Sequence, residues 1–266
     1  MPGRPNDRAA WERDLHEQIH GPAQDAWRDY MRRVYARLTA AWLPATGGGR
    51  LKTDLFEEAT SSRHPLGDLG DGAMGIDLCP AVACLARRRL QGQGREARLL
   101  VGDLRALPIV SNGVAQVLSG SSLDHFETEA ELRAGLSELQ RILAPGGVLA
   151  LVLDNPENPV LWLRSRLPFE WLRGLRLVPY YVGATLDRHA GRRCLEAVGL
   201  EVLEVAAVAH APRLLAIVLI RWLEALGAVP AAAALGRSLD AWEALGRWQT
   251  RFLTGYYLAF HVRKPP

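Results

Sequence analysis

Short apolar runs alternate with helix-length segments over most of this chain of 266 residues. Such runs are typical of buried strands, and their alternation with helical patterns indicates βαβ units around a parallel sheet. The sequence predicts strands at residues 50–54, 74–77, 98–102, 114–119, 148–153, 201–208 and 255–262. It predicts helices between them at residues 80–90, 129–143 and 186–198. We therefore expect an α/β fold in which helices sandwich a seven-stranded sheet.

The residues in front of two of these helices are typical of helix starts. Thr128 is the predicted N-cap of the second helix, and Glu131 stands at the spacing of a capping box. Thr185 is the predicted N-cap of the third helix, with Asp187 in its first turn.

The first 46 residues precede the predicted sheet. Between residues 25 and 42, apolar side chains recur at spacings of mostly three and four, which predicts an amphipathic helix with an aromatic-rich face. A shorter helical pattern covers roughly residues 8–19. We predict an N-terminal helical cap, residues 1–46, followed by a domain of residues 47–266.

Two segments interrupt the alternation, at about residues 155–183 and 210–253. The second is rich in Leu, Ala and Trp, and two amphipathic helices packed on the core are its simplest interpretation. A lid over an apolar acceptor, a dimer surface and a membrane-facing patch are alternatives that the sequence leaves open. Arg221, Glu224 and Pro230 make the most apolar stretch a poor membrane span.

Charge and composition exclude several classes of protein. With 32 basic and 29 acidic residues the net charge is +3, which does not indicate a nucleic-acid partner. The three cysteines form no CxxC pair, and the sequence contains no metal-ligand spacing, P-loop or hydrolase nucleophile motif. The first residues lack the apolar run of a signal peptide. We expect a cytoplasmic protein without a metal site or an integral membrane span.

Polar residues end or follow five of the predicted strands. They are Asp54, Asp77, Asp103, Ser119 and Asp154. Ligands of open parallel sheets bind at the carboxyl ends of the strands. A single acidic residue there is often a helix cap or a loop residue. Several carboxylates facing one crevice, however, repel one another unless a ligand, a cation or hydrogen-bond donors hold them, so we predict a ligand site at this edge.

Three segments follow one another in a characteristic order: GIDLCP at 75–80, LLVGDLRALPIVSNGVAQVLSGSSLDHF at 99–126 and LSELQRILAPGGVLALVLD at 136–154. In this order they resemble the class I S-adenosylmethionine-dependent methyltransferases, of the methyltransferase type 11 kind. The resemblance implies a Rossmann-like fold whose last strand is antiparallel, and S-adenosyl-L-methionine as the cofactor. It also implies that Asp77, beside Leu78, binds the ribose hydroxyls. By the same resemblance, Asp103 accepts the adenine amino group and the Leu104 N–H meets a ring nitrogen.

The first motif departs from that family, which has an acidic residue and a glycine-rich loop after its first strand. This chain reads GRLKTDLFEEATSS there. In one interpretation the site is remodelled: Asp54, Glu57 or Glu58 pairs with the ammonium group of the cofactor, and Lys52 or Thr53 binds its carboxylate. In the other, the site has decayed, and the two glutamates belong to a solvated helix face. An ion pair with Asp54 at the edge of the core is the alternative role of Lys52.

Two residues are candidates for catalysis, His125 after the fourth strand and Asp154 after the fifth. Histidine can accept a proton near neutral pH, although a packing role for His125 is an equal alternative. The candidate acceptor contacts are Trp162, Arg166, Tyr180, Tyr181 and His210. This mixture suits a bulky aromatic or anionic acceptor, while a cover for the sheet edge is the simpler alternative.

The resemblance implies methyl transfer from S-adenosylmethionine to oxygen, nitrogen or carbon of a small molecule, such as an aromatic natural product. A non-catalytic methyltransferase-like binding protein is one alternative. An enzyme of the same fold that catalyses another biosynthetic step, such as a cyclisation, is a second. The apolar second insertion would also allow a homodimer.

Overall fold

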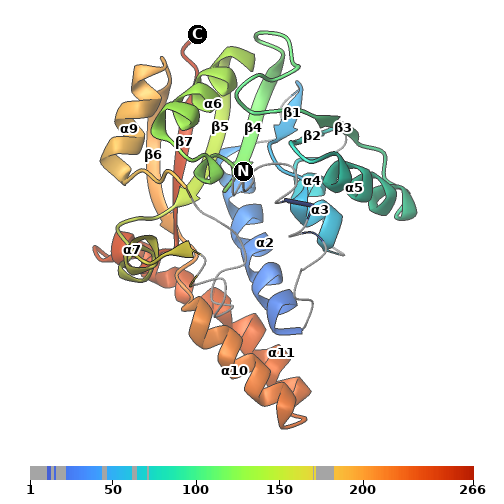
Figure 1. Ribbon diagram of the computed structural model, residues 1–266, viewed down its shortest axis with the longest axis vertical. Helices are drawn as coiled ribbons and strands as arrows, with labels where there is room; N and C mark the ends of the chain where they lie inside the picture. The colour runs from blue at the N-terminus through green and yellow to red at the C-terminus, as the bar shows by residue number, and fades with distance from the viewer. Residues whose placement is uncertain are drawn as a thin grey trace.

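The computed structural model describes residues 11–12, 15, 22–43, 47–61, 65–70, 72–169, 171 and 183–266. Its centre is a seven-stranded sheet in the order β3-β2-β1-β4-β5-β7-β6 (Figure 1). The strands are β1 (Arg50–Lys52), β2 (Met74–Asp77), β3 (Arg98–Val101), β4 (Val114–Gly120), β5 (Leu143–Asp154), β6 (Glu201–Val208) and β7 (Tyr257–Arg263). The neighbours from β3 to β5 pair in parallel, and β7 pairs antiparallel with β5 and β6. The predicted fold, including the antiparallel last strand, is confirmed.

Helices cover both faces of the sheet (Figure 1). One face packs on α2 (Pro22–Trp42), α3 (Phe56–Thr60), α4 (Pro65–Asp68) and α5 (Pro80–Gly92), and the other on α6 (Glu129–Ile142) and α9 (Arg188–Ala197). Strand β5 shows the alternation that this requires: Ala150 and Val152 join the first cluster, while Leu149 and Leu151 join the second. The sheet is therefore buried on both sides.

The helix starts agree with one prediction and correct another. The Thr128 hydroxyl accepts the N–H of Glu131 at 3.2 Å, so the predicted N-cap of α6 is confirmed. Helix α9 is capped by Asp187 instead of Thr185, and its carboxylate accepts the N–H groups of His189 and Ala190. The Asp187 carboxylate, two and three residues before these donors, reaches both at 2.8 Å, so the helix begins two residues later than predicted.

Helix α2 contributes a full side of apolar residues to the first cluster, among them Trp27, Tyr30 and Val34. It packs against the same sheet face as α5, as one of the layers of the sandwich. The division of the chain at residue 46 stays a prediction. The shorter helix predicted at 8–19 lies almost wholly outside the described residues.

The two predicted insertions are helical where the structure describes them. The first contains α7 (Pro159–Arg166), and the second contains α10 (Arg213–Ala225), α11 (Val229–Ser238), the 3-10 helix η2 (Leu239–Arg247) and α12 (Arg251–Thr254). Helices α10 and α11 pack on each other and on α2, and extend from the end of the molecule opposite the C-terminus (Figure 1). Asp240 of η2 binds Arg33 and Arg37 of α2 at 2.5 and 2.8 Å, and Tyr30 of α2 donates to Glu243.

Candidate functional site

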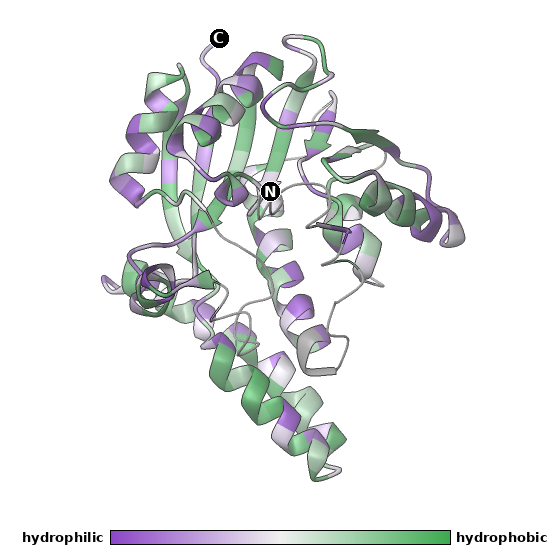
Figure 2. Cartoon of the chain, in the orientation of Figure 1, coloured by the Kyte–Doolittle hydropathy of each residue, from purple (hydrophilic) through white to green (hydrophobic). Residues whose placement is uncertain are grey.

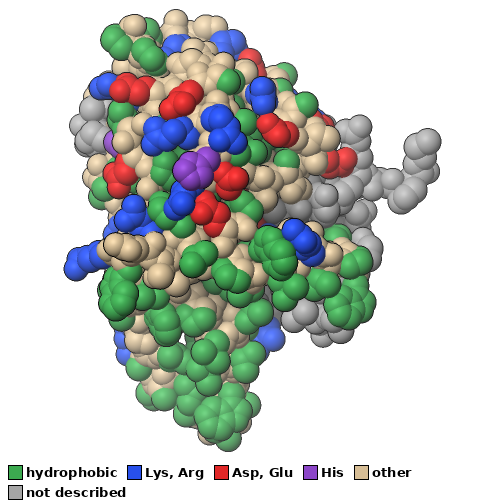
Figure 3. All heavy atoms as spheres, turned by 90° about the vertical axis from the view of Figure 1, so that its left-hand side faces the viewer, with side chains coloured by type: hydrophobic (Ala, Val, Ile, Leu, Met, Phe, Trp, Pro, Cys, Tyr) green, Lys and Arg blue, Asp and Glu red, His purple; other side chains and the backbone are tan. Residues whose placement is uncertain are grey.

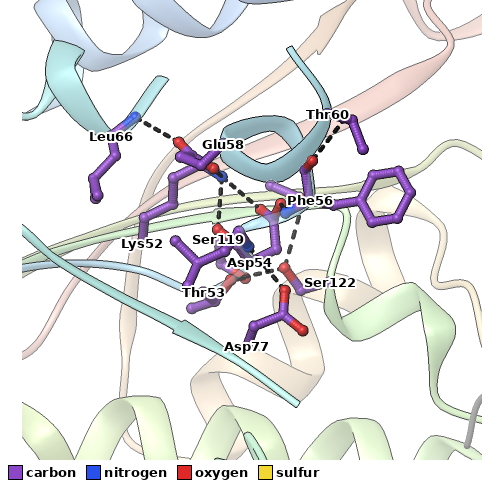
Figure 4. A network of polar contacts seen from close by, with 12 residues as sticks. Lys52, Thr53, Asp54, Phe56, Glu58, Thr60, Leu66, Asp77, Ser119 and Ser122 are labelled. Atoms are coloured by element: carbon purple, nitrogen blue, oxygen red, sulfur yellow. Dashed lines mark hydrogen bonds and ion pairs between the residues drawn. The ribbon is translucent and has the colours of Figure 1, made fainter. Parts of the chain in front are cut away.

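The strand order reverses between β1 and β4, which pair in parallel at the centre of the sheet. This reversal leaves a crevice at the carboxyl ends of the strands, where ligands of such folds bind. Thr53 follows β1, and its hydroxyl lies 3.0 Å from the Ser119 hydroxyl and 2.8 Å from that of Ser122 (Figure 4). Three hydroxyl groups thus tie the ends of the two central strands together.

Lys52 at the end of β1 is buried and fully engaged by its own chain. Its Nζ lies 2.7 Å from the Asp54 carbonyl oxygen, 3.1 Å from Asp54 Oδ2 and 2.9 Å from Glu58 Oε2 (Figure 4). Glu58 is completely buried, and its other oxygen accepts the N–H of Leu66. Burial lowers the pKa of Lys52, but the two carboxylates raise it overall. An ammonium group has three N–H donors, and all three are used in holding α3 against β1.

The loop after β1 follows a tight path without glycines. The Leu55 side chain is buried against Gly75 of β2, where an added Cβ would lie 2.4 Å from Leu55 Cδ2. The Leu55 N–H donates to Asp77 Oδ2 at 2.9 Å, and the Cys79 N–H donates to Oδ1 at 2.8 Å. Each carboxylate oxygen accepts one N–H and retains a further lone pair. The protein therefore orients Asp77 as an acceptor at the end of β2, with Leu78 half-buried beside it.

The carboxylates of Asp54 and Glu58 contact the Lys52 ammonium group, and the charge of Lys52 also acts on Glu57. Burial raises the pKa of Glu57 to about 7, and the charges of Arg28 and Lys52 oppose that rise. When Glu57 is ionised, three carboxylates face two cations, Lys52 and Arg28, so the cluster then favours an added cation. Arg28 comes from α2, and its contribution was missed because only the packing of α2 on the sheet brings it near.

Asp103 after β3 is held by Arg105. Arg105 Nη2 lies 2.6 Å from Asp103 Oδ2, and Nη1 lies 2.6 Å from Glu131 Oε1. The guanidinium also lies 5.3 Å from the centre of the Phe126 ring. The Asp103 carboxylate remains partly exposed, and Leu104 beside it is half-buried. An adenine amino group at this carboxylate would share it with Arg105.

Asp124 follows β4, and its side chain is completely buried. Its Oδ2 accepts the Ser121 hydroxyl at 2.7 Å and the Asp154 N–H at 3.1 Å, which connects the ends of β4 and β5. Oδ1 has no hydrogen-bond partner among the described residues, and burial raises the pKa of this carboxyl. The sequence favours Asp124, next to His125, as a residue that orients a helix start or a neighbour, and these two hydrogen bonds agree with the second role.

His125 lies under an aromatic side chain from the N-terminal segment. The Trp11 ring meets the His125 ring edge-on at 4.8 Å and the Phe56 ring at 5.9 Å. Phe56 follows β1 and His125 follows β4, so Trp11 bridges the two sides of the strand-order reversal. Trp11 lies far from every motif in the sequence, so the sequence does not predict its contacts with Phe56 and His125.

The structure does not bring all of the predicted acceptor contacts together. Asp154 pairs with Arg164 of α7, and the exposed Trp162 ring lies 4.3 Å from the Arg166 guanidinium. His210 is buried, with Nδ1 at 2.8 Å from the Thr254 hydroxyl and Nε2 at 2.9 Å from the Ala207 carbonyl oxygen. Both ring nitrogens of His210 are used inside the protein, so its role here is structural. Tyr180 and Tyr181 lie outside the described residues.

Part of the chain matches a known family of domains. Residues 63–147 match the family model described as a methyltransferase domain. A demethylmenaquinone methyltransferase of Thermus thermophilus is 35% identical over 115 residues, which are 43% of this chain and 46% of that protein. The match therefore spans just under half of that relative's length.

Two solved structures illustrate the likeness in fold. The [4+2]-cyclase SpnF has a TM-score of 0.58 at 17% identity, over 90% of this chain and 82% of that one. A geranyl diphosphate C-methyltransferase from Streptomyces coelicolor, solved with S-adenosyl-L-homocysteine, has a TM-score of 0.53 at 14% identity, over 86% of this chain and 74% of that one. At these identities the likeness concerns the fold.

Proposed function

We propose that this chain, which has the class I S-adenosylmethionine-dependent methyltransferase fold, binds S-adenosylmethionine across the ends of β1 to β4 and transfers its methyl group to a small molecule. The observation that carries the proposal is the orientation of Asp77. Two backbone N–H groups hold its carboxylate at the end of β2, beside the strand-order reversal, with lone pairs left on both oxygens. An ionised carboxylate in that position can accept both hydroxyl groups of a ribose.

The nucleoside half of the cofactor lies along β2 and β3 in this proposal. Asp77 accepts the ribose hydroxyls, with Leu78 packing beside the sugar. Asp103 accepts the adenine amino group and the Leu104 N–H donates to the ring. Arg105 keeps its ion pair with Glu131, whose carboxylate binds Arg105 Nη1.

The methionine half lies over β1 and α3. The excess of carboxylates supports Glu57 as the partner of the cofactor's ammonium group, with Asp54 adding negative charge. Lys52 orients Asp54 and Glu58 in place of binding the cofactor carboxylate, because its donors are already used. Arg28, whose charge acts on Glu57, supplies the positive charge for the carboxylate of the cofactor. The hydroxyls of Thr53 and Ser119 form the floor between β1 and β4.

The chain's part in the reaction is alignment and exclusion of water. When bound, S-adenosylmethionine supplies an electrophilic methyl group on a positive sulfur. Trp11 covers the ends of β1 and β4, which shields this region from solvent. For acceptors that must lose a proton on methylation, His125 beneath Trp11 accepts that proton. Asp154, through its ion pair with Arg164, holds α7 at the end of β5. Correct alignment alone supplies a large part of the rate of such displacements.

The acceptor in this proposal is a bulky aromatic small molecule. The demethylmenaquinone methyltransferase to which the chain is similar supports this class by its name. Trp162 and Arg166 on α7 offer an aromatic face and a cation, and we retain Tyr180 and Tyr181 as further contacts. Incubation of the chain with methyl-labelled S-adenosylmethionine and a panel of quinones and phenols tests whether the acceptor belongs to this class. Label in the organic extract supports transfer, and its absence with every acceptor, despite bound cofactor, would favour the second candidate.

The second candidate is a protein of the same fold without methyl transfer: either a non-catalytic binding protein or an enzyme for another biosynthetic step, such as a cyclisation. The glycine-free loop after β1 favours it, because Leu55 and α3 occupy the place of the expected glycine-rich loop. The likeness to SpnF shows that this fold also serves a cyclase.

Glu57→Gln is expected to weaken binding of S-adenosylmethionine about tenfold or more, because a charge-assisted contact to the ammonium group is lost. Binding of 5′-methylthioadenosine, which has the nucleoside but no amino-acid end, should not change. Calorimetric titration at pH 8 measures both, since Glu57, with a pKa of about 7, is then ionised. The exposed Glu96→Gln is the matched control. An equal loss for both ligands would reject the role given to Glu57.

Nucleoside binding should depend on pH through Asp77, whose pKa is raised by burial to about 6. Below that pH the free carboxyl carries a proton, which must leave before both ribose hydroxyls can be accepted. Affinity for 5′-methylthioadenosine should therefore be constant above pH 7 and fall about tenfold per unit below pH 6. Titrations from pH 5 to pH 8 at about constant ionic strength check this. A flat profile would contradict it.

A further inference from the structure

The outward side of α10 is apolar along its whole length. Its exposed side chains, with the residue that follows the helix, are Leu214, Leu215, Val218, Leu219, Trp222 and Leu226. At 100° per residue these positions share one side of the helix, which we call the α10 face. Ala216 and Ile220 on the opposite side are buried. A helix in water normally directs its polar side outward, so the polarity of α10 is reversed.

The charged residues of α10 do not interrupt this face. Arg213 and Glu224 are half-buried on the inward side, and Arg221 is exposed at its border. Helix α10 consists largely of hydrophobic residues (Figure 2), and green side chains gather over the lower part of the molecule in Figure 3. Helix α7 adds the exposed Val160, Trp162 and Leu163 on the same side of the molecule (Figure 1). Contiguous exposed apolar surface of this kind marks an interaction site.

The charges around the α10 face are predominantly positive. The second insertion contains Arg213, Arg221, Arg237, Arg247 and Arg251 against Glu224, Asp240 and Glu243. Two of these acids are directed inward: Asp240 binds arginines of α2, and Glu243 accepts from Tyr30 and from the N–H of His210. The exposed charged side chains of α10 and of α11, which packs on it, are Arg221 and Arg237, so the exposed charge of this helix pair is positive. Apolar residues with tryptophan and a basic border are complementary to an anionic lipid surface.

A second copy of the chain fits this face less well. In a two-fold dimer the same patch of both subunits meets, so the basic border of one copy would face that of the other. A membrane-spanning role is excluded for α10 by length, because 13 residues extend about 20 Å against about 30 Å of hydrocarbon. No helix in the described part of the chain is long and apolar enough to cross a membrane. The geometry favours a helix lying in the plane of the surface.

We propose that α10 binds the surface of an anionic lipid bilayer, with Leu215, Val218 and Trp222 inserted between the headgroups. This binding does not depend on the proposed methyl transfer. Membrane binding would nevertheless affect how the acceptor reaches the site. Strands β5 and β6 both run antiparallel to β7, so they end at the same edge of the sheet. Helices α7 and α10, which follow these strands, therefore begin at the edge where the candidate site lies. An apolar acceptor dissolved in the bilayer would then enter from the adjacent surface.

Sedimentation with lipid vesicles tests the proposal. The wild-type chain should sediment with phosphatidylcholine vesicles that contain phosphatidylglycerol, and less with phosphatidylcholine alone or in added salt. Leu215→Ser with Trp222→Ser should weaken binding at least about tenfold, and Arg221→Glu about fivefold. The matched control is Val101→Ser with Val110→Ser, two exposed apolar residues elsewhere, which should bind as the wild type does.

Three results would overturn the proposal. The first is a wild-type chain that remains in the supernatant at millimolar anionic lipid. The second is an α10 variant, Leu215→Ser with Trp222→Ser, that binds as tightly as the control. A wild-type dimer in solution that the α10 variant converts to a monomer, measured by light scattering, would identify a second copy as the occupant. All substituted side chains are exposed, so equal thermal midpoints should show that each variant is folded.

Discussion

Asp77→Ala is expected to reduce the affinity for S-adenosylhomocysteine by about a hundredfold or more. A hydrogen bond to a charged group contributes about 1.5–3 kcal/mol, and the ribose loses two of them with the carboxylate. Each 1.4 kcal/mol is about a factor of ten in affinity. Calorimetric titration above pH 7 measures the effect, since Asp77, with a pKa of about 6, is then ionised.

The control for Asp77→Ala must separate lost binding from lost stability. The substitution also leaves the N–H groups of Leu55 and Cys79 without their acceptor, which destabilises the fold. Glu138 accepts the Leu107 N–H at 2.7 Å on the other side of the sheet, so Glu138→Ala imposes a similar loss away from the site. That variant should bind as the wild type does. A folded Asp77→Ala chain with wild-type affinity would reject the proposed position of the nucleoside.

Lys52→Met is expected to lower the free energy of unfolding by about 3–5 kcal/mol, because it leaves the completely buried Glu58 without its counter-charge. Urea unfolding at neutral pH, followed by circular dichroism, measures the loss. The double variant Lys52→Met with Glu58→Gln should recover a large part of it, since no buried charge is then left unpaired.

Arg105→Met is the comparison for this ion pair. Arg105 also binds two acids, Asp103 and Glu131, but all three side chains are partly exposed to water. Solvent screens such pairs, so the expected loss is about 0–1 kcal/mol. If Lys52→Met costs no more than Arg105→Met, the buried pair does not hold α3 on β1 as we conclude.

The sequence predicted the sheet well because the apolar runs that form its strands are local features of the chain. The apolar runs that became β2 and β6 end at the residues predicted for them, and Asp77 lies where its motif places it. For Lys52 the sequence left two roles open, a contact to the cofactor and an ion pair with Asp54, and the structure has the ion pair. Its second partner, Glu58, was not predicted because Glu58 comes close to Lys52 only when α3 forms. Spacing along the chain does not reveal whether a buried charge serves a ligand or its neighbours.

Long-range packing accounts for the other differences. Tyr30 of α2 and Glu243 of η2 lie 213 residues apart in the sequence, and their contact joins the second insertion to the first long helix. This docking turns Asp240 and Glu243 inward and leaves the apolar side of α10 exposed, which periodicity alone does not predict. His210 becomes a structural residue for the same reason, because α12 brings Thr254 to its ring.

Equilibrium dialysis of the wild-type chain against labelled S-adenosylmethionine at pH 8 tests the central claim most directly. We predict saturable binding at one site per chain that unlabelled S-adenosylhomocysteine displaces. No saturable binding up to millimolar ligand, with the chain folded throughout, would contradict the proposed site and with it the proposed methyl transfer.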